Sequence, residues 1–167
     1  MHDELTKVDI EKMEAEILYR VTQLRPKLIE DVKVAREFGD LSENDEYKVA
    51  KREKNRNESR IRYLERMVKT AKLVEAAPTH SGIGLFDKVT LFIEEDEETE
   101  LVQLVTSMRQ DAMAGRITRS SPVGKAIWGR TVGDRVLVET DSGYSYYVQI
   151  QAVEHGEDDD SLPILPY

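Results

Sequence analysis

The sequence contains no cysteine, and this absence excludes several kinds of site at once. A disulfide scaffold, a thiolate zinc site and thiol catalysis all need that residue. The three histidines, His2, His80 and His155, are scattered over segments that we expect to be loops, so neither a histidine metal cluster nor a histidine base is indicated. No apolar run approaches the roughly 20 residues of a membrane-spanning helix. The first residues lack the apolar stretch of a secretion signal, and we expect a cytoplasmic protein.

Charge is plentiful and unevenly distributed. Of the 167 residues 34% are charged, which suits one ordinary domain or two small ones with a large surface. Residues 1–77 hold 17 basic and 17 acidic side chains, whereas residues 78–167 hold 7 and 16. Within the first half, residues 47–72 carry 10 Lys or Arg and only 3 Glu. A basic limb and an acidic lobe are predicted, so the low isoelectric point does not exclude a nucleic-acid partner.

Residues 8–38 show the apolar spacing of one long helix. Apolar side chains recur in alternating steps of three and four, the pattern of a coiled-coil seam. Pro26 removes one amide donor and should bend the helix without ending it, because the pattern resumes beyond it. Gly39 then follows as a helix stop. The two rows of the seam are Ile10, Ile17, Leu24 and Phe38, and Val21, Leu28 and Ala35.

A second helix is predicted to follow after about four residues. Ser42 is the expected N-cap, with Asp45 completing a capping-box-like pair, and Pro78 marks the expected end. Helices of about 31 residues are each roughly 46 Å long, and so short a linker makes them antiparallel. Residues 1–77 are therefore expected to form a coiled-coil hairpin with its tip at 39–43.

Beyond this hairpin the apolar period changes to two, which indicates strands. A small α+β lobe is expected over 78–155, with one short helix that begins at Ser121-Pro122 and is capped by the serine. Residues 156–167 contain an acidic run, and we expect them to form a mobile tail. The predicted fold class is therefore α+β. The expected strands cover residues 89–93, 101–106, 135–140 and 144–153.

Two acidic residues at the hairpin tip suggest chemistry. Asp40 and Glu43 flank the turn, where the chain is most exposed. Mg²⁺ accepts one or two carboxylates together with waters and a substrate phosphate, but two carboxylates do not form a complete site alone. Acidic residues in the first turn of a helix also favour the helix dipole. The spacing alone therefore leaves both a functional and a purely structural role open.

The tip sequence also resembles a known signature. From Arg36 to Tyr47 it reads Arg-Glu-Phe-Gly-Asp-Leu-Ser-Glu-Asn-Asp-Glu-Tyr, which is similar to the tip of the Gre transcript-cleavage factors of bacterial RNA polymerase. Further segments match positions of that family in the same order over most of the chain. These are Leu5-Thr6, Arg25-Pro26, Gly115-Arg116-Ile117, Ser120-Ser121-Pro122-Val123 and Gly133-Asp134.

The resemblance implies a coiled-coil hairpin followed by an FKBP-like lobe. It implies that the lobe, 78–155, docks at the rim of the polymerase secondary channel while the hairpin reaches the active centre. There the factor would promote hydrolysis of the 3′ end of a backtracked transcript. Asp40 and Glu43 would match the acidic pair that helps to hold the second, weakly bound Mg²⁺. The protein would be an accessory factor and not an enzyme, would not bind the ion in isolation, and is expected to be a monomer.

Three residues beside the acidic pair are candidates for supporting the tip. Ser42 is expected mainly as the helix cap, although both Ser42 and Asn44 could orient water or phosphate. Tyr47 either packs beneath the tip or touches the RNA end, and we favour packing.

The basic stripe of the second helix is a candidate RNA contact. Stripes of Lys and Arg bind phosphate backbone without reading sequence, and the alternative is a solvated face balanced by glutamates. By the resemblance the stripe would meet the extruded RNA 3′ segment. Its density favours the GreB branch of the family, whereas Leu41 favours the GreA branch, so the branch is left open. The residues chosen are Lys48, Lys51, Arg52, Arg56 and Arg60.

Two departures from the family pattern lie in or beside the lobe. Met108-Arg109-Gln110 stands where the family usually has an acidic pair ahead of the position of Asp111, and 156–167 extends past the usual end. Polymerase affinity or specificity is therefore expected to differ. The main alternative function is a non-cleaving regulator that occupies the secondary channel, and a second is a free-standing nucleic-acid binder. The intact acidic pair disfavours the non-cleaving regulator. The acidic lobe disfavours the free-standing nucleic-acid binder, because it would repel duplex DNA.

Overall fold

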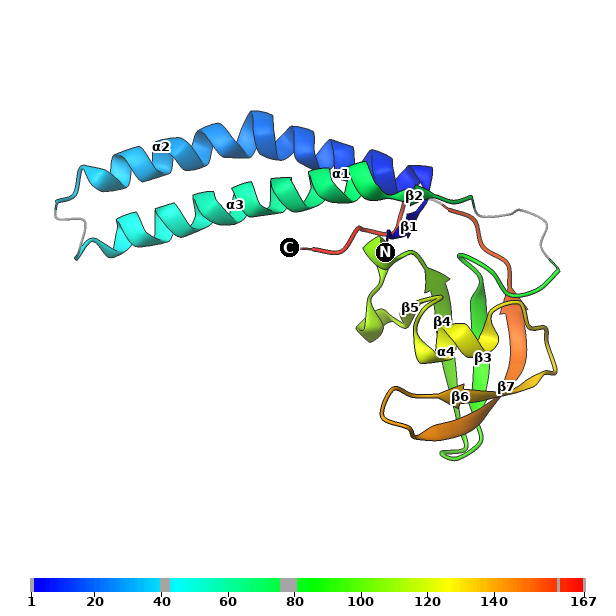
Figure 1. Ribbon diagram of the computed structural model, residues 1–167. Helices are drawn as coiled ribbons and strands as arrows, with labels where there is room; N and C mark the ends of the chain where they lie inside the picture. Colours follow the sequence, from blue (N-terminus) through cyan, green and yellow to red (C-terminus); the bar gives the residue numbers. More distant parts are fainter. Residues whose placement is uncertain (1, 40–42, 76–80, 159, 167) are drawn as a thin grey trace. The chain divides into compact units, whose positions relative to one another are not determined.

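A computed structural model describes residues 2–39, 43–75, 81–158 and 160–166 of the chain (Figure 1). Contacts among them divide the protein into two compact units. One unit, here called the finger, comprises Ile10–Ala71, and the other, the lobe, combines Asp3–Asp9 with Lys72–Pro166. The finger is a pair of long antiparallel helices and the lobe contains a five-stranded sheet, so the predicted α+β class is confirmed.

The first arm of the helical hairpin is continuous but contains one wider turn. α1 spans Lys7–Tyr19, the π-helical turn η1 spans Arg20–Leu24, and α2 spans Arg25–Arg36. In η1 the amide of Arg25 donates to the carbonyl of Arg20, five residues earlier. Proline lacks an amide donor and its ring crowds the preceding turn, so a wider turn just before Pro26 accommodates it. The arm curves without breaking, as predicted (Figure 1).

The second arm, α3, spans Asp45–Thr70 and is shorter than predicted at both ends. It begins at Asp45 because Asn44 is the N-cap, whose side-chain oxygen accepts a hydrogen bond from the amide of Tyr47 at 3.0 Å. The prediction that Ser42 caps this helix is therefore wrong, and Ser42 itself lies outside the described residues. At 1.5 Å per residue, its 26 residues give a length of about 39 Å.

Two short strands, one before α1 and one after α3, were not predicted. Ala71 ends the helix in an extended conformation, and β2, Lys72–Leu73, then pairs in parallel with β1, Glu4–Leu5. Strands of two residues are too short to show a periodic pattern in the sequence. This pairing joins the first residues of the chain to the lobe, so a boundary at 77/78 does not separate the two units.

The interior of the hairpin is only partly apolar. Near the tip, α2 buries aliphatic side chains, whereas the middle of α3 buries polar ones as well. No described helix combines the length and apolarity needed to cross a membrane. The buried residues are Leu28, Val32 and Ala35 on α2, and Asn57, Arg60, Ile61 and Leu64 on α3.

The lobe contains a sheet in the order β5-β4-β3-β7-β6. Its neighbours are antiparallel except for β4 and β5, and the three-residue β5 is an additional strand that was not predicted. β4 begins three residues earlier than predicted. The strands are β3 (Lys88–Ile93), β4 (Glu98–Val105), β5 (Arg116–Thr118), β6 (Arg135–Glu139) and β7 (Ser145–Glu154).

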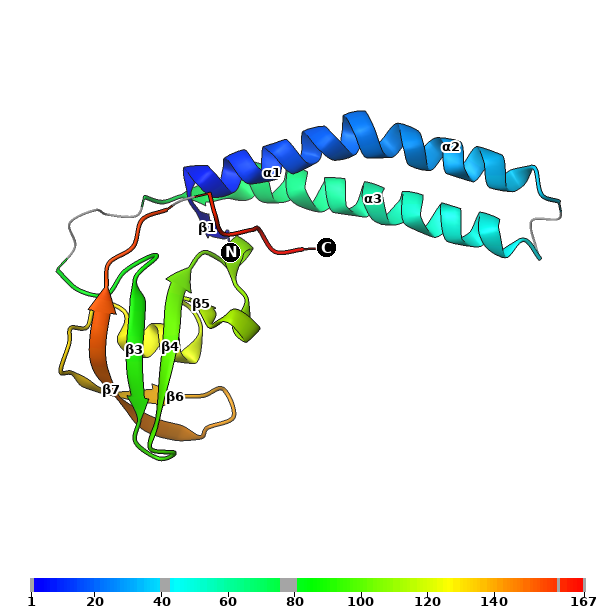
Figure 2. The same ribbon diagram turned by 180° about the vertical axis from the view of Figure 1, so that it is seen from behind.

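One helix covers one face of this sheet. α4, Pro122–Ile127, begins as predicted, because the Ser121 hydroxyl accepts a hydrogen bond from the amide of Gly124 at 3.1 Å. α4 lies in front of the sheet in Figure 1 and behind it in Figure 2, which is the same molecule turned by 180°. The helix therefore covers only one face of the sheet. Alternate residues of the strands pack with Ile127, and each full burial contributes about 1.5–3 kcal/mol. They are Val89, Leu91, Val102, Leu104, Val136, Val138, Val148 and Ile150.

The described part of 156–167 is packed against the rest of the lobe and is not the mobile tail that was predicted. The amide of Gly156 donates to Asp87 at 3.1 Å, and the amide of Leu165 donates to the carbonyl of Met108. Asp158 pairs with the guanidinium of Arg109, whose side chain is fully buried. The reason is electrostatic, because a buried arginine needs carboxylate partners and the acidic run supplies one.

Arg109 is the centre of a buried cluster that joins three distant parts of the chain. Besides Asp158, it bonds through Nε to the carboxylate of Asp9 at 2.7 Å, and that carboxylate is also fully buried. Its Nη2 lies 3.4 Å from the hydroxyl of Thr6, and its guanidinium lies 5.1 Å from the centre of the Phe86 ring. The departure from the family pattern at Arg109 is therefore an internal feature of the lobe.

Candidate tip and nucleic-acid interface

The described part of the tip is held together by Asn44. Its side-chain oxygen caps α3, and its amide nitrogen donates to the carbonyl of Ala35 at 2.7 Å, near the end of α2. One side chain thus ties the start of the second arm to the end of the first. The sequence suggested that Asn44 orients water or phosphate, whereas both ends of its amide are engaged with the backbone.

Tyr47 lies one turn inside α3 and is half-buried. The Arg36 guanidinium lies 5.5 Å and the Lys51 ammonium 5.9 Å from the centre of its ring. A hydrogen bond from Arg36, aided by the nearby positive charges, lowers the pKa of the Tyr47 phenol below its ordinary value. These contacts place the ring of Tyr47 beside cations of both arms. The choice of packing over contact with the RNA end stays a prediction.

Of the predicted acidic pair, the structure describes Glu43 alone. Glu43 is exposed and directly precedes the Asn44 cap, while Asp40 lies outside the described residues. Across the described part of the chain, no three His, Cys, Asp or Glu side chains are grouped so that they could hold a metal ion. An exposed carboxylate at the end of a hairpin can contribute to a shared Mg²⁺ site, because this ion keeps water and substrate ligands.

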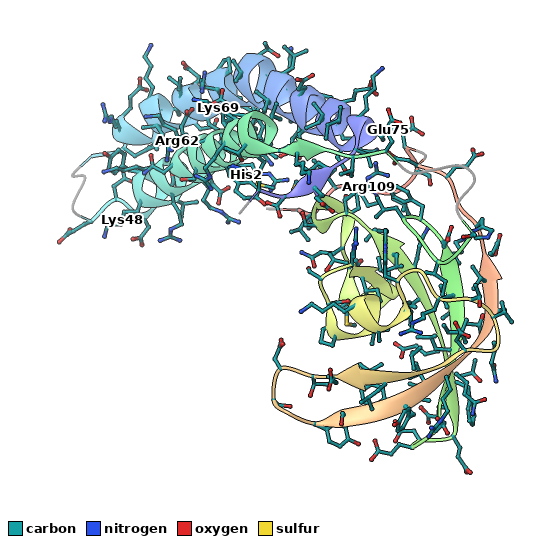
Figure 3. The ribbon with its side chains drawn as sticks, turned by 45° about the vertical axis from the view of Figure 1, so that its right-hand side comes forward. His2, Lys48, Arg62, Lys69, Glu75 and Arg109 are labelled. Atoms are coloured by element: carbon teal, nitrogen blue, oxygen red, sulfur yellow. The ribbon has the colours of Figure 1, made fainter. Side chains whose placement is uncertain are left out.

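A shallow basic hollow lies on α3 next to the tip. Its volume is about 370 Å³, and the four cations that line it are all exposed. Figure 3 labels Lys48 near the tip end of α3, and Arg62 and Lys69 further along the same helix. Exposed ammonium and guanidinium groups around a hollow suit the phosphates of a nucleic-acid backbone. The lining residues are Lys48, Lys51, Arg52, Asn55, Arg56 and Ser59.

Arg60 does not belong to this hollow, and its prediction as an RNA contact is corrected. Its side chain is only 2% exposed, and its guanidinium bonds to both oxygens of Glu16, at 2.7 and 3.2 Å. Arg60 was grouped with the other cations because the excess of basic residues over 47–72 does not show which of them face outwards. Its position in the helix turns it towards the first arm, where it forms a partly buried ion pair with Glu16.

Comparison with known families decides what kind of protein this is. The model for the N-terminal domain of transcription elongation factors GreA and GreB matches residues 4–73, and the model for their C-terminal domain matches residues 78–155. The chain belongs to the GreA/GreB family. The recognition made from the tip sequence is confirmed.

Two relatives of this Gre factor, both named GreA, agree with the family match. Transcription elongation factor GreA of Geobacillus kaustophilus is 41% identical over 151 residues, which cover 90% of this chain and 95% of that protein. GreA of Bacillus licheniformis is 40% identical over 140 residues, covering 83% and 89%. Among solved structures, GreA factor homolog 1 of Thermus thermophilus is 25% identical, with a TM-score of 0.43 and coverage of 93% and 100%.

Behind the tip, the finger of this Gre factor contains a polar layer that sequence reasoning missed. Glu16 receives hydrogen bonds from Arg60 and from Arg20, the latter at 2.8 Å, and Arg20 also donates to the amide oxygen of Asn57 at 2.9 Å. Close by, the Arg25 guanidinium bonds to both oxygens of Glu58, at 2.7 and 3.0 Å. The spacing of Glu16 and Arg20 by four residues, which suits an ion pair along a helix, was the only indication of this layer in the sequence. Only the contact with the second arm shows that these charges are partly buried between the arms.

Glu16 should make the stability of the finger depend on pH. Burial raises the pKa of its carboxyl, but hydrogen bonds from Arg60 and Arg20 outweigh that effect and leave it below the ordinary value of 4.5. A lowered pKa in the folded state stabilises the fold above the unfolded pKa, and this contribution is lost as the pH falls through the folded value. We expect Glu16→Gln to reduce the free energy of unfolding by about 2 kcal/mol at pH 7.

Urea unfolding followed by far-ultraviolet circular dichroism, run near pH 7 and near pH 3, measures this effect. The difference in the free energy of unfolding between wild type and Glu16→Gln should be markedly smaller at the acidic pH. Glu14→Gln is the matched control, because Glu14 is exposed on the same helix and should change little at either pH. A Glu16→Gln deficit of equal size at both pH values would show that the pairing is not what stabilises the arm.

Proposed function

We propose that this Gre factor stimulates RNA polymerase to cleave backtracked transcripts. In this proposal the hairpin enters the secondary channel, the lobe docks at the channel rim, and the tip reaches the polymerase active centre. One observation carries the proposal. The acidic tip residue Glu43 lies just before the N-cap of the helix whose first turns present the basic hollow, so an exposed carboxylate and a cationic surface lie at the same end of the finger.

The tip carboxylates of Asp40 and Glu43 would add two oxygen ligands to an ion that the polymerase holds loosely. A second Mg²⁺ supplies activation of the attacking water and stabilisation of the leaving oxygen in a phosphodiester displacement. The Asn44 bridge keeps the start of α3 fixed beside the end of α2, which limits the freedom of the neighbouring Glu43. The chain would thus contribute ligands and position, and the polymerase would contribute the remaining chemistry.

The protein itself is proposed to be an accessory factor. Two tip carboxylates supply neither a complete Mg²⁺ shell nor a general base. The factor should therefore act only together with polymerase.

The test is to add the protein to stalled, backtracked elongation complexes from its own host. Short RNA fragments released from the 3′ end would support the proposal. Naked RNA incubated with nuclease-free protein over a range of Mg²⁺ concentrations should remain intact. Binding to polymerase without release of fragments would favour a non-cleaving regulator of the secondary channel, and cleavage of naked RNA would place the active centre in this chain.

The basic hollow leads to a prediction about backtracking depth. Replacing Lys51, Arg52 and Arg56 by Gln should keep the helix, because Gln is a comparable helix former. The loss of three phosphate contacts should reduce cleavage of deeply backtracked complexes by about tenfold at low salt, since such contacts are electrostatic. Complexes backtracked by one or two nucleotides present RNA mainly to the tip and should be nearly unaffected.

Gel analysis of released fragments at each depth and at several salt concentrations measures this prediction. The triple variant Arg62→Gln, Arg66→Gln, Lys69→Gln is the charge-matched control, because these exposed cations lie on α3 outside the hollow. Equal losses from both triple variants would show that total charge, and not the hollow, is what matters.

A further inference from the structure

A second concave surface lies on the finger, and it differs in character from the basic hollow. It is a groove of about 570 Å³ between α2 and α3, close to the tip. Its lining combines an aliphatic floor with a rim of carboxylates. The residues are Lys27, Leu28 and Asp31 from α2, and Asp45, Glu46, Val49, Ala50 and Glu53 from α3. We call this surface the acid-rimmed groove.

The floor of the acid-rimmed groove is apolar and accessible. Val49 lies within α3 and its side chain is 53% exposed. Leu28 of α2, which lines the same groove, is 8% exposed. Ala50 is half-buried and adds a small aliphatic surface. Leaving a branched aliphatic side chain in water at the centre of a groove forgoes stabilisation that a partner could provide.

The rim carries an excess of negative charge. Four carboxylates line the groove against one ammonium, and that ammonium, on Lys27, already bonds to Asp31 at 3.0 Å. Asp45 and Glu46 in the first turn also suit the helix dipole, but Glu53 lies two turns further along. Glu53 lies 3.8 Å from Arg56, near the limit for an ion pair. The groove therefore favours a cation and disfavours phosphate.

The groove and the basic hollow occupy different faces of α3. With 3.6 residues per turn, successive side chains are about 100° apart around the helix axis. The α3 residues that line the hollow and those that line the groove are therefore centred roughly a third of a turn apart around that axis. One helix thus presents a cationic face and, beside it, an anionic face with an apolar floor. A partner for the second face needs an aliphatic stem that ends in a positive charge, and lysine and arginine side chains have this structure.

We propose that the acid-rimmed groove binds a lysine or arginine side chain of a polypeptide partner. The aliphatic stem lies on Val49 and Leu28, and the charged group meets the carboxylates of Asp45, Glu46 or Glu53. If the proposed function is correct, that partner is the protein wall of the polymerase channel. Contacts of opposite sign on two faces would then fix the rotation of the finger about its long axis, so that the basic hollow faces the RNA.

Site-specific photo-crosslinking tests which class of partner meets each face. A photoreactive amino acid is placed at Val49, or at Arg52 in the basic hollow as the matched position, and each protein is bound to backtracked elongation complexes. Val49 should crosslink to polymerase polypeptide, and mass spectrometry should map the adduct to a segment containing Lys or Arg. Arg52 should crosslink mainly to RNA. RNA adducts from Val49, or no adduct from a variant that binds normally, would overturn the proposal.

Charge reversal provides an independent measurement that does not use the crosslinker. The double variant Glu46→Lys, Glu53→Lys should weaken polymerase binding by about tenfold at low salt, and the deficit should shrink as salt rises. Glu65→Lys is the control, because Glu65 is exposed on α3 outside the groove. A double variant that binds like the control would overturn the groove inference alone. If wild-type protein neither binds polymerase nor stimulates cleavage, the proposed function itself fails.

Discussion

Replacing Asp40 or Glu43 by alanine is expected to abolish stimulated transcript cleavage while binding to polymerase stays near the wild-type level. In the proposed mechanism each carboxylate would supply a ligand to a Mg²⁺ ion that the polymerase alone would retain poorly. Loss of a metal ligand at a catalytic centre removes transition-state stabilisation, and a decrease of at least about 100-fold in the cleavage rate is expected. Single-turnover cleavage of backtracked complexes measures the rate, and competition with labelled wild-type protein measures binding.

Two controls make this result specific for metal retention. High Mg²⁺ should restore part of the activity of each single variant, because mass action compensates for a weakened site. Glu37→Ala is the matched acidic control, since Glu37 is exposed at the end of α2 and outside the predicted pair. A double variant of Asp40 and Glu43 that cleaves at the wild-type rate would refute the proposed mechanism.

Replacing Arg109 by methionine is expected to cause the largest loss of stability in the lobe. Methionine fills much of the same volume but leaves the fully buried carboxylate of Asp9 without its cation. Removing one member of a buried ion pair costs about 3–5 kcal/mol, because the other charge stays desolvated. Asp9→Asn combined with Arg109→Met should recover part of the loss, since the amide carries no charge to compensate.

The fluorescence of the only tryptophan, Trp128, reports on the lobe during urea unfolding. Arg135→Met is a suitable control, because Arg135 pairs with Glu94 at 2.7 Å on the surface, with 52% of its side chain exposed. An exposed pair of this kind contributes at most about 1 kcal/mol. If Arg109→Met unfolds at the same urea concentration as Arg135→Met, the buried cluster does not stabilise the lobe.

The periodic parts of this molecule could be predicted from its sequence. The two long helices and the four longer strands were predicted because an apolar period of 3.6 or 2 extends over enough residues to be unambiguous. The α4 cap at Ser121 was predicted because serine before proline is a local signal. The two-residue strands β1 and β2 and the three-residue β5 carry no such signal, and only tertiary pairing produces them.

The errors at the candidate site have a common physical origin. Asn44 and Ser42 are both good caps, and what favours Asn44 is the second hydrogen bond that its amide makes to Ala35 on the other arm. Arg60 and its neighbours have the same charge, and the partner Glu16, 44 residues away, decides that Arg60 is interior. Contacts between residues distant in sequence determine these roles, and local patterns do not record them.

The cluster around Arg109 also governs how this protein can be divided. Its members come from the first residues of the chain, from the middle of the lobe and from Asp158, which lies beyond the part matched by the family models. A fragment that starts at residue 78 would carry Arg109 without Asp9 and would also lack strand β1. A chimera that joins this lobe to the hairpin of another Gre factor would keep the ion pair only if its first residues also supply a carboxylate at the position of Asp9. Transplanting the lobe together with residues 3–9 and the C-terminal segment of this chain therefore keeps both carboxylate partners of Arg109.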